Sequence, residues 1–211
     1  YQGANEVEFS PNGKFIAGMQ YVPNGKIAVW QLSDNNKVFE IEQKTRMNDI
    51  GWSANSNTIY SVNQEGFLSS WSLTERKLIN EIRLDRDRLV DLDGTDQKVL
   101  AAGGAGGNII TYNLKTEAKN EINLGSFINR VAIANSIDRV AGAGGDGYLY
   151  IFQLSTGELL HKKYAHDDIN YYVTFSPDHK ILATTGEDNY VRLWDVNSGK
   201  LLNEIRGNKN E

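Results

Sequence analysis

The sequence predicts an all-β protein in which one four-stranded unit is repeated five times. Three observations predict it: a period of 40 to 42 residues, short runs of alternating apolar and polar residues, and turn residues between those runs. The period is marked by the aromatic residue that closes one run in every repeat, at Trp30, Trp71, Tyr112, Phe152 and Trp194. Five residues before each aromatic stands a residue that tolerates positive φ, at Gly25, Gly66, Gly107, Gly147 and Asn189. Two features that keep the same period indicate a genuine structural repeat.

Each repeat is predicted to contain four short strands joined by turns. The fifth repeat shows this best, with runs at Tyr172–Ser176, Ile181–Thr185, Tyr190–Trp194 and Lys200–Ile205. A four-stranded unit of this length is one blade of a β-propeller, in which antiparallel sheets stand around a central channel. The predicted blades span residues 7–49, 50–91, 92–130, 131–171 and 172–211 of a single domain or segment, 1–211.

The fifth repeat resembles a blade of the WD-repeat family. The resemblance rests on His166, Phe175–Ser176–Pro177–Asp178, Leu182–Ala183–Thr184, Asp188 and Trp194–Asp195, and weaker matches extend it over essentially the whole chain. It implies a hydrogen-bonded structural clamp made of His166, Thr184, Asp188 and Trp194. The first four repeats lack the histidine, so the resemblance implies the complete clamp only in the fifth.

The composition excludes several classes of protein. The chain has 211 residues, a formal net charge of −5 and no cysteine, which rules out disulfides, thiolate metal sites and a cysteine nucleophile. The acidic balance disfavours nucleic acid as a partner, and no apolar run approaches the ~18 residues of a membrane-spanning helix. We expect an intracellular protein of unknown compartment that does not insert into membranes.

No motif in the sequence supports catalysis, a cofactor or a metal site. The run Gly142–Gly147 spells G-x-G-x-x-G but leads into a predicted strand, whereas dinucleotide binding requires a helix there. The three histidines lack metal-ligand spacing, and the carboxylates are interpreted as scattered singly, with no acidic position recurring between repeats. We therefore predict no enzyme, no cofactor and no metal.

The candidate partner-binding residues lie in the loops between blades and in the long first-blade turn. The resemblance places these segments on one face, around the mouth of the channel. The candidates are Tyr21, Arg46, Arg88, Phe127, Arg130, Asp168 and Tyr171. Arginine beside aromatic residues suits an acidic or phosphorylated peptide. The alternative is that these arginines form ion pairs with nearby aspartates, such as Asp49, Asp85, Asp87 and Asp91.

Function and completeness are both predicted with alternatives. We expect a non-catalytic scaffold for protein–protein interaction, a subunit of a multiprotein assembly; the alternatives are a ligand-sensing module of a larger signalling protein and, less favoured, a propeller enzyme. The ring has five blades, or the chain is part of a seven-bladed ring. The start at Tyr1 and the in-phase ends favour a segment of a longer ring.

Overall fold

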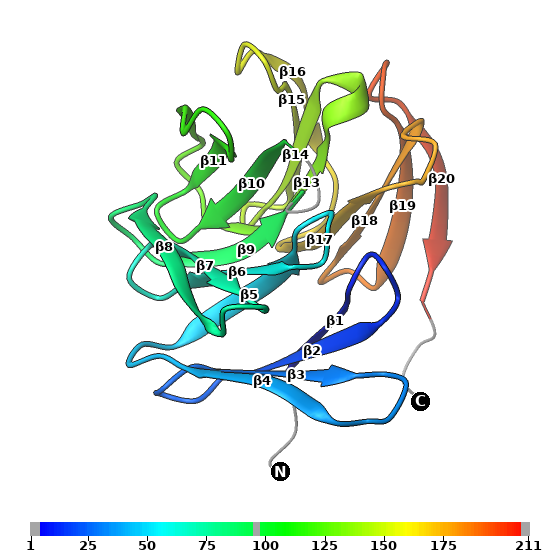
Figure 1. The fold of residues 1–211 in the computed structure, drawn as a ribbon. Helices are drawn as coiled ribbons and strands as arrows, with labels where there is room; N and C mark the ends of the chain where they lie inside the picture. Colours follow the sequence, from blue (N-terminus) through cyan, green and yellow to red (C-terminus); the bar gives the residue numbers. More distant parts are fainter. Residues whose placement is uncertain (1–4, 95–97, 208–211) are drawn as a thin grey trace.

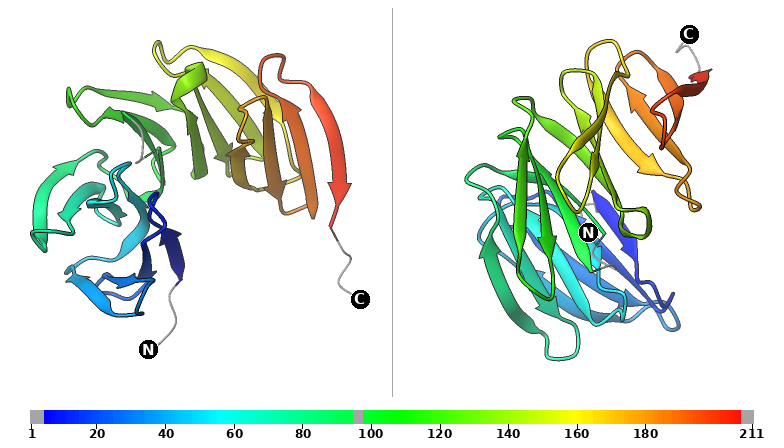
Figure 2. Two further views of the ribbon diagram at one scale, coloured as in Figure 1. Left: turned by 45° about the vertical axis from the view of Figure 1, so that its right-hand side comes forward. Right: turned by 90° about the horizontal axis from the view of Figure 1, so that it is seen from above.

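The computed structural model describes residues 5–94 and 98–207, and these residues form five four-stranded antiparallel sheets. The sheets follow one another along an arc, with their innermost strands gathered towards its centre (Figures 1 and 2). The described residues contain one short 3-10 helix, η1, at Asn135–Ile137. The prediction of an all-β fold built from four-stranded propeller blades is confirmed. Tyr1 lies outside the described residues.

Each sheet is one blade, and its four strands are neighbours in chain order. Blade 1 contains β1 (Glu6–Phe9), β2 (Phe15–Gln20), β3 (Lys26–Gln31) and β4 (Lys37–Glu42). Blade 2 contains β5 (Met47–Trp52), β6 (Thr58–Asn63), β7 (Phe67–Ser72) and β8 (Lys77–Arg83). Blade 3 contains β9 (Leu89–Asp93), β10 (Val99–Gly104), β11 (Asn108–Asn113) and β12 (Lys119–Asn123). Blade 4 contains β13 (Ile128–Ala134), β14 (Arg139–Gly144), β15 (Tyr148–Gln153) and β16 (Leu159–Tyr164). Blade 5 contains β17 (Asn170–Phe175), β18 (Ile181–Gly186), β19 (Tyr190–Asp195) and β20 (Leu201–Arg206).

Because the strands alternate in direction, two kinds of connection end up on the same side of the molecule. The turn between the second and third strands of a blade and the loop to the next blade lie at one end of the sheet, which we call the loop face. The turns between the first and second strands and between the third and fourth strands lie at the opposite end. This arrangement brings the candidate binding segments together.

Consecutive blades pack face to face through apolar side chains. In blade 4, Leu149 and Ile151 point to the following blade and pack with Val173, Leu182 and Trp194 of blade 5. The opposite face of blade 4 presents Tyr150 and Phe152 to blade 3. Each side chain of this size that is fully buried contributes roughly 1.5–3 kcal/mol. The repeated aromatic is thus a contact between neighbouring sheets.

The two terminal blades each leave one apolar face uncovered by another described blade. Val191 and Leu193 of blade 5 are half-buried, whereas Leu149 and Ile151 at the same positions of blade 4 are fully buried. On blade 1, Val7 and Phe9 are 58% and 65% exposed. Figure 2 shows these blades at the two ends of the arc. The choice between a five-bladed ring and part of a seven-bladed ring stays a prediction.

The turns between second and third strands explain most of the repeated glycines. Gly66, Gly107 and Gly147 adopt φ of about +80°, and Asn189 adopts +62°. At Gly147 a Cβ would lie 2.3 Å from the His166 carbonyl oxygen, so only glycine fits there. The prediction of positive φ is wrong for Gly25, because the longer first-blade turn takes another path. A Cβ at Gly25 would still meet the Thr45 oxygen at 2.7 Å, so close approach requires the glycine.

The sheets begin a few residues before the predicted blade boundaries. The register shifts at the start of four inner strands, between Met47 and Asp49, Leu89 and Asp91, Ile128 and Arg130, and Asn170 and Tyr172. A β-bulge places two residues opposite one and interrupts the alternation of apolar and polar residues. Alternation therefore does not mark where these strands begin, and the predicted blade bounds stay a prediction.

The packing of the repeated aromatic predicts different costs for the same substitution in two blades. Trp194 is almost fully buried between blades 4 and 5, whereas Trp30 of blade 1 is half-buried. We expect Trp194→Ala to lower the free energy of unfolding by ~3–5 kcal/mol, and Trp30→Ala to cost clearly less. Urea unfolding followed by circular dichroism would measure both. Equal losses would contradict the proposed difference in covering.

Candidate interaction surface

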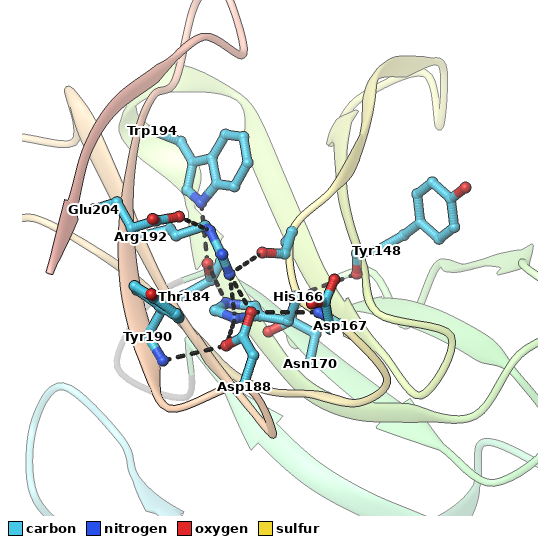
Figure 3. A network of polar contacts seen from close by, with 11 residues as sticks. Tyr148, His166, Asp167, Asn170, Thr184, Asp188, Tyr190, Arg192, Trp194 and Glu204 are labelled. Carbon is cyan, nitrogen blue, oxygen red and sulfur yellow. Dashed lines mark hydrogen bonds and ion pairs between the residues drawn. The ribbon is translucent and has the colours of Figure 1, made fainter. Parts of the chain in front are cut away.

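Four side chains of blade 5 and its preceding loop form a continuous chain of hydrogen bonds (Figure 3). Trp194 Nε1 donates to Thr184 Oγ1 at 3.0 Å, and Thr184 Oγ1 lies 2.9 Å from His166 Nε2. The other ring nitrogen of His166 lies 2.8 Å from Asp188 Oδ1. The structure therefore brings together all four residues of the clamp that the resemblance implied.

The charges around this clamp favour one tautomer of His166. Asp188 also accepts hydrogen bonds from Arg192 and from the backbone N–H of Tyr190. Burial acts to raise the pKa of Asp188, but the hydrogen bonds from Arg192 and His166 outweigh it and lower that pKa to about 2. His166 Nδ1 faces both Asp188 Oδ1 and, at 2.9 Å, Arg192 Nη1. The carboxylate favours a proton on Nδ1, and Arg192 has Asp188 and the Ala165 carbonyl oxygen as acceptors, so Nε2 accepts from the Thr184 hydroxyl. Every polar group along the clamp then has a partner.

Blades 2 and 3 keep only parts of this arrangement. In blade 2, Trp71 Nε1 donates to Ser61 Oγ at 3.1 Å, which reproduces the tryptophan–hydroxyl contact. In the loop between blades 2 and 3, Asp85 stands where His166 stands in the last loop, and its carboxylate accepts from Asn108 Nδ2 at 3.1 Å. A buried carboxylate and amide thus replace the imidazole there.

The innermost strands bring five residues from equivalent positions to the centre of the arc. The strand registers align Glu6, Asp49, Asp91, Arg130 and Tyr172, one from each blade. The interpretation of the carboxylates as scattered is therefore wrong, because three of them share one position of the repeat. An apolar residue directly follows each member of this set, at Val7, Ile50, Leu92, Val131 and Val173. An alignment of the repeats on these apolar residues would have revealed the set.

Arg130 contacts the other four members of this central set. It pairs with Asp91, lies 3.6 Å from Asp49 and 3.9 Å from Glu6, and sits 4.9 Å from the centre of the Tyr172 ring. The Arg130 side chain is only 27% exposed, and those of Asp49 and Asp91 are nearly buried. One guanidinium thereby links all five blades.

The central carboxylates also bond to the backbone of the next blade. Asp49 Oδ2 accepts from the N–H of Leu92 at 2.8 Å, and Asp91 Oδ2 accepts from the N–H of Val131 at 2.6 Å. Burial and the neighbouring Asp91 carboxylate raise the pKa of Asp49, and Arg130 opposes this rise. The inner strands are therefore joined by hydrogen bonds as well as by Arg130.

Two of the candidate arginines stack on two candidate aromatic residues of the loop face. The Arg46 guanidinium lies 5.1 Å from the centre of the Tyr21 ring, and that of Arg88 lies 5.4 Å from the centre of the Phe127 ring. Arg46 and Arg88 are exposed, and neither forms an ion pair within residues 5–94 and 98–207. The alternative of local pairing with aspartate thus describes Arg130 but not these two.

The remaining candidates lie beside blade 5. Asp168 is exposed in the loop between blades 4 and 5, and Tyr171 lies in β17, where its hydroxyl donates to Glu187. The structure therefore separates the stacked arginines of blades 1 to 4 from a carboxylate-rich segment at blade 5. The role of all these residues in binding stays a prediction.

The part of the chain that the structure describes offers no group of three or more histidines and carboxylates arranged to hold a metal ion. Within the same residues, no helix is long and apolar enough to cross a membrane. The described polar residues form hydrogen bonds, ion pairs and cation–π stacks at the ends of rigid sheets.

Sheets that pack face to face, repeated aromatic contacts and a buried polar clamp define a propeller-type repeat protein. A family model described as "WD domain, G-beta repeat" matches residues 157–195, the segment that contains the whole clamp. This match and the relatives below support the resemblance of the chain to the WD-repeat family.

The chain is similar to several curated proteins, one of which is named for its WD repeats. The chain is 25% identical to WD repeat-containing protein 1 of Rattus norvegicus over 92% of its own length and 34% of that protein. It is 24% identical to E3 ubiquitin-protein ligase COP1 of Arabidopsis thaliana over 82% of its length and 26% of that protein. Protein SPA1-RELATED 4 of the same plant is 23% identical over 90% of the chain and 25% of that protein. The chain spans about a third or less of these relatives.

The position of Arg130 predicts a large structural effect. Arg130→Met would leave Asp49, Asp91 and Glu6 without their cation, so we expect the free energy of unfolding to fall by ~3–5 kcal/mol. Asp91→Asn in the Arg130→Met background should restore part of the loss, because it removes one uncompensated charge. Chemical denaturation of the single and double variants would measure both effects. A loss below about 1 kcal/mol for Arg130→Met would show that the central ion pairs do not hold the blades.

The lowered pKa of Asp188 predicts sensitivity to acid. Its ordinary value in an unfolded chain is about 3.9, so the folded state binds its proton less readily. The stability that this carboxylate contributes is present above about pH 4 and is lost as the pH falls towards about 2. Urea unfolding at several pH values should show wild type and Asp188→Asn converging over this range. A difference that is constant with pH would contradict the assignment.

Proposed function

We propose that the chain is a non-catalytic scaffold that binds a partner protein or peptide through its loop face, within a larger complex. WD-repeat proteins generally act as interaction scaffolds. The observation that carries the proposal for this chain is the pair of stacks formed by Arg46 with Tyr21 and Arg88 with Phe127.

The two stacks have the properties of binding anchors. A guanidinium resting on a ring is already ordered, so binding costs less side-chain entropy than it would for a free arginine. Its planar edge can still donate paired hydrogen bonds to a carboxylate or phosphate. Arginine and tyrosine are also enriched among the residues that dominate interface energies. We therefore propose a partner whose acidic or phosphorylated residues contact the loop face of blades 1 to 4.

Charge reversal at the two stacks tests this proposal. We expect the Arg46→Glu/Arg88→Glu variant to lose partners that the wild-type chain captures from an extract of its native source, with an unchanged midpoint of thermal unfolding. The loss follows because glutamate repels an acidic partner. Quantitative mass spectrometry of the captured proteins would measure it.

The matched control reverses two exposed lysines on the opposite face. Lys14 lies in the first turn of blade 1 and Lys115 in the last turn of blade 3. The Lys14→Glu/Lys115→Glu variant changes net charge equally and should capture the same partners as wild type. The proposal fails if both double variants retain the wild-type set, or if both lose it equally.

A further inference from the structure

One pocket of the loop face, beside the stack of Arg46 on Tyr21, is lined by several hydrogen-bond donors. It lies between blades 1 and 2, has a volume of about 710 Å³, and is lined by Tyr21, Pro23, Lys44, Thr45, Arg46, Gln64 and Glu65. This size is within the range of sites that hold small ligands or single side chains of a partner. We propose that this pocket binds the phosphate group of a phosphorylated serine or threonine in a partner peptide, an inference that rests on the proposed function.

The donors of the pocket match the acceptors of a phosphate. Lys44 and Arg46 supply two cations, neither of them in an ion pair within the described ranges. The Thr45 hydroxyl accepts from Asn63 Nδ2 at 3.2 Å, which leaves its own hydrogen free to donate. The exposed side-chain amide of Gln64 adds another donor. A phosphate offers three strong acceptor oxygens and close to two negative charges at neutral pH.

The backbone around the pocket is fixed before any ligand arrives. The N–H of Gly25 donates to the backbone carbonyl oxygen of Thr45 at 3.0 Å, and the N–H of Gln43 donates to the carbonyl oxygen of Gly25 at 2.8 Å. The N–H of Gln64 donates to the Arg46 oxygen at 3.0 Å. These bonds tie the turn of blade 1, the loop between the blades and the turn of blade 2 to one another. The backbone that carries the donors therefore needs little reorganisation when an anion binds.

The long first-blade turn makes this pocket specific to one place on the molecule. It carries Tyr21, whose N–H donates to Asn5 Oδ1 at 2.9 Å and whose ring supports Arg46. Arg88 occupies the position equivalent to Arg46 in the next loop between blades. The backbone carbonyl oxygen of each arginine accepts a hydrogen bond from the turn between the second and third strands of the blade that follows its loop. The stack of Arg88 on Phe127 lies outside the pocket, and Arg86 beside Asp87 takes the position of Lys44 there. Arg88 is therefore the internal control for Arg46.

The test uses an oriented library of synthetic peptides in which phosphoserine is fixed and its flanking residues vary. The whole chain should retain phosphorylated peptides and not the same library carrying serine. Arg46→Ala should weaken retention by roughly 10- to 100-fold, as expected for loss of hydrogen bonds to a charged group. Arg88→Ala should weaken it less. Glu65→Gln, which removes a carboxylate from the lining of the pocket, should strengthen it.

Further arms separate the sources of phosphate. Inorganic phosphate should compete only weakly, and vesicles containing phosphoinositides should not bind. The proposal is overturned if serine and phosphoserine libraries are retained equally, if vesicles bind in place of peptides, or if Arg46→Ala has no effect. Treating the native extract with phosphatase distinguishes this failure from that of the proposed function. Capture that depends on Arg46 and Arg88 but survives phosphatase would leave the scaffold standing and remove the phosphate site.

Discussion

The fold depends on one constraint: a four-stranded sheet has two apolar faces and cannot cover either of them alone. Each blade therefore needs a neighbour on both sides, and the repeated aromatic residue of blades 2 to 5 packs against the blade before it. The central set adds a second link, because Arg130 of blade 4 contacts carboxylates of blades 1, 2 and 3 and the Tyr172 ring of blade 5. Apolar packing joins neighbours, and the central ion pairs join blades that are distant in sequence.

This rigidity is what makes the loop face useful. The loops are held at both ends by strands and across their backbones by hydrogen bonds to the adjacent turns. Their side chains can then vary without disturbing the sheets, and they carry the exposed charges. Two exposed arginines keep their charge unneutralised because aromatic rings support them in place of carboxylates. Arg130 is the opposite case, because carboxylates within the structure neutralise its charge.

The sequence was sufficient to predict the fold class, the period and the clamp of blade 5. Strand alternation and turn residues are local signals, and His166, Thr184, Asp188 and Trp194 matched a known pattern. The central set was missed because β-bulges and a period that varies between 40 and 42 residues hide the equivalence of Asp49 and Asp91. Arg130 could not be distinguished from Arg46 and Arg88, because only the three-dimensional register shows which arginine meets three carboxylates. The pocket beside Tyr21 depends on the path of a long turn, which no local pattern specifies.

The most direct measurement of the central claim is hydrogen–deuterium exchange of the chain with and without a captured native partner. If the loop face is the docking surface, slower exchange on binding should be confined to the loops between blades and the turns between second and third strands, above all residues 43–46 and 84–88. Protection confined to the opposite turns, or to the outer strands β4, β8, β12, β16 and β20, would contradict it.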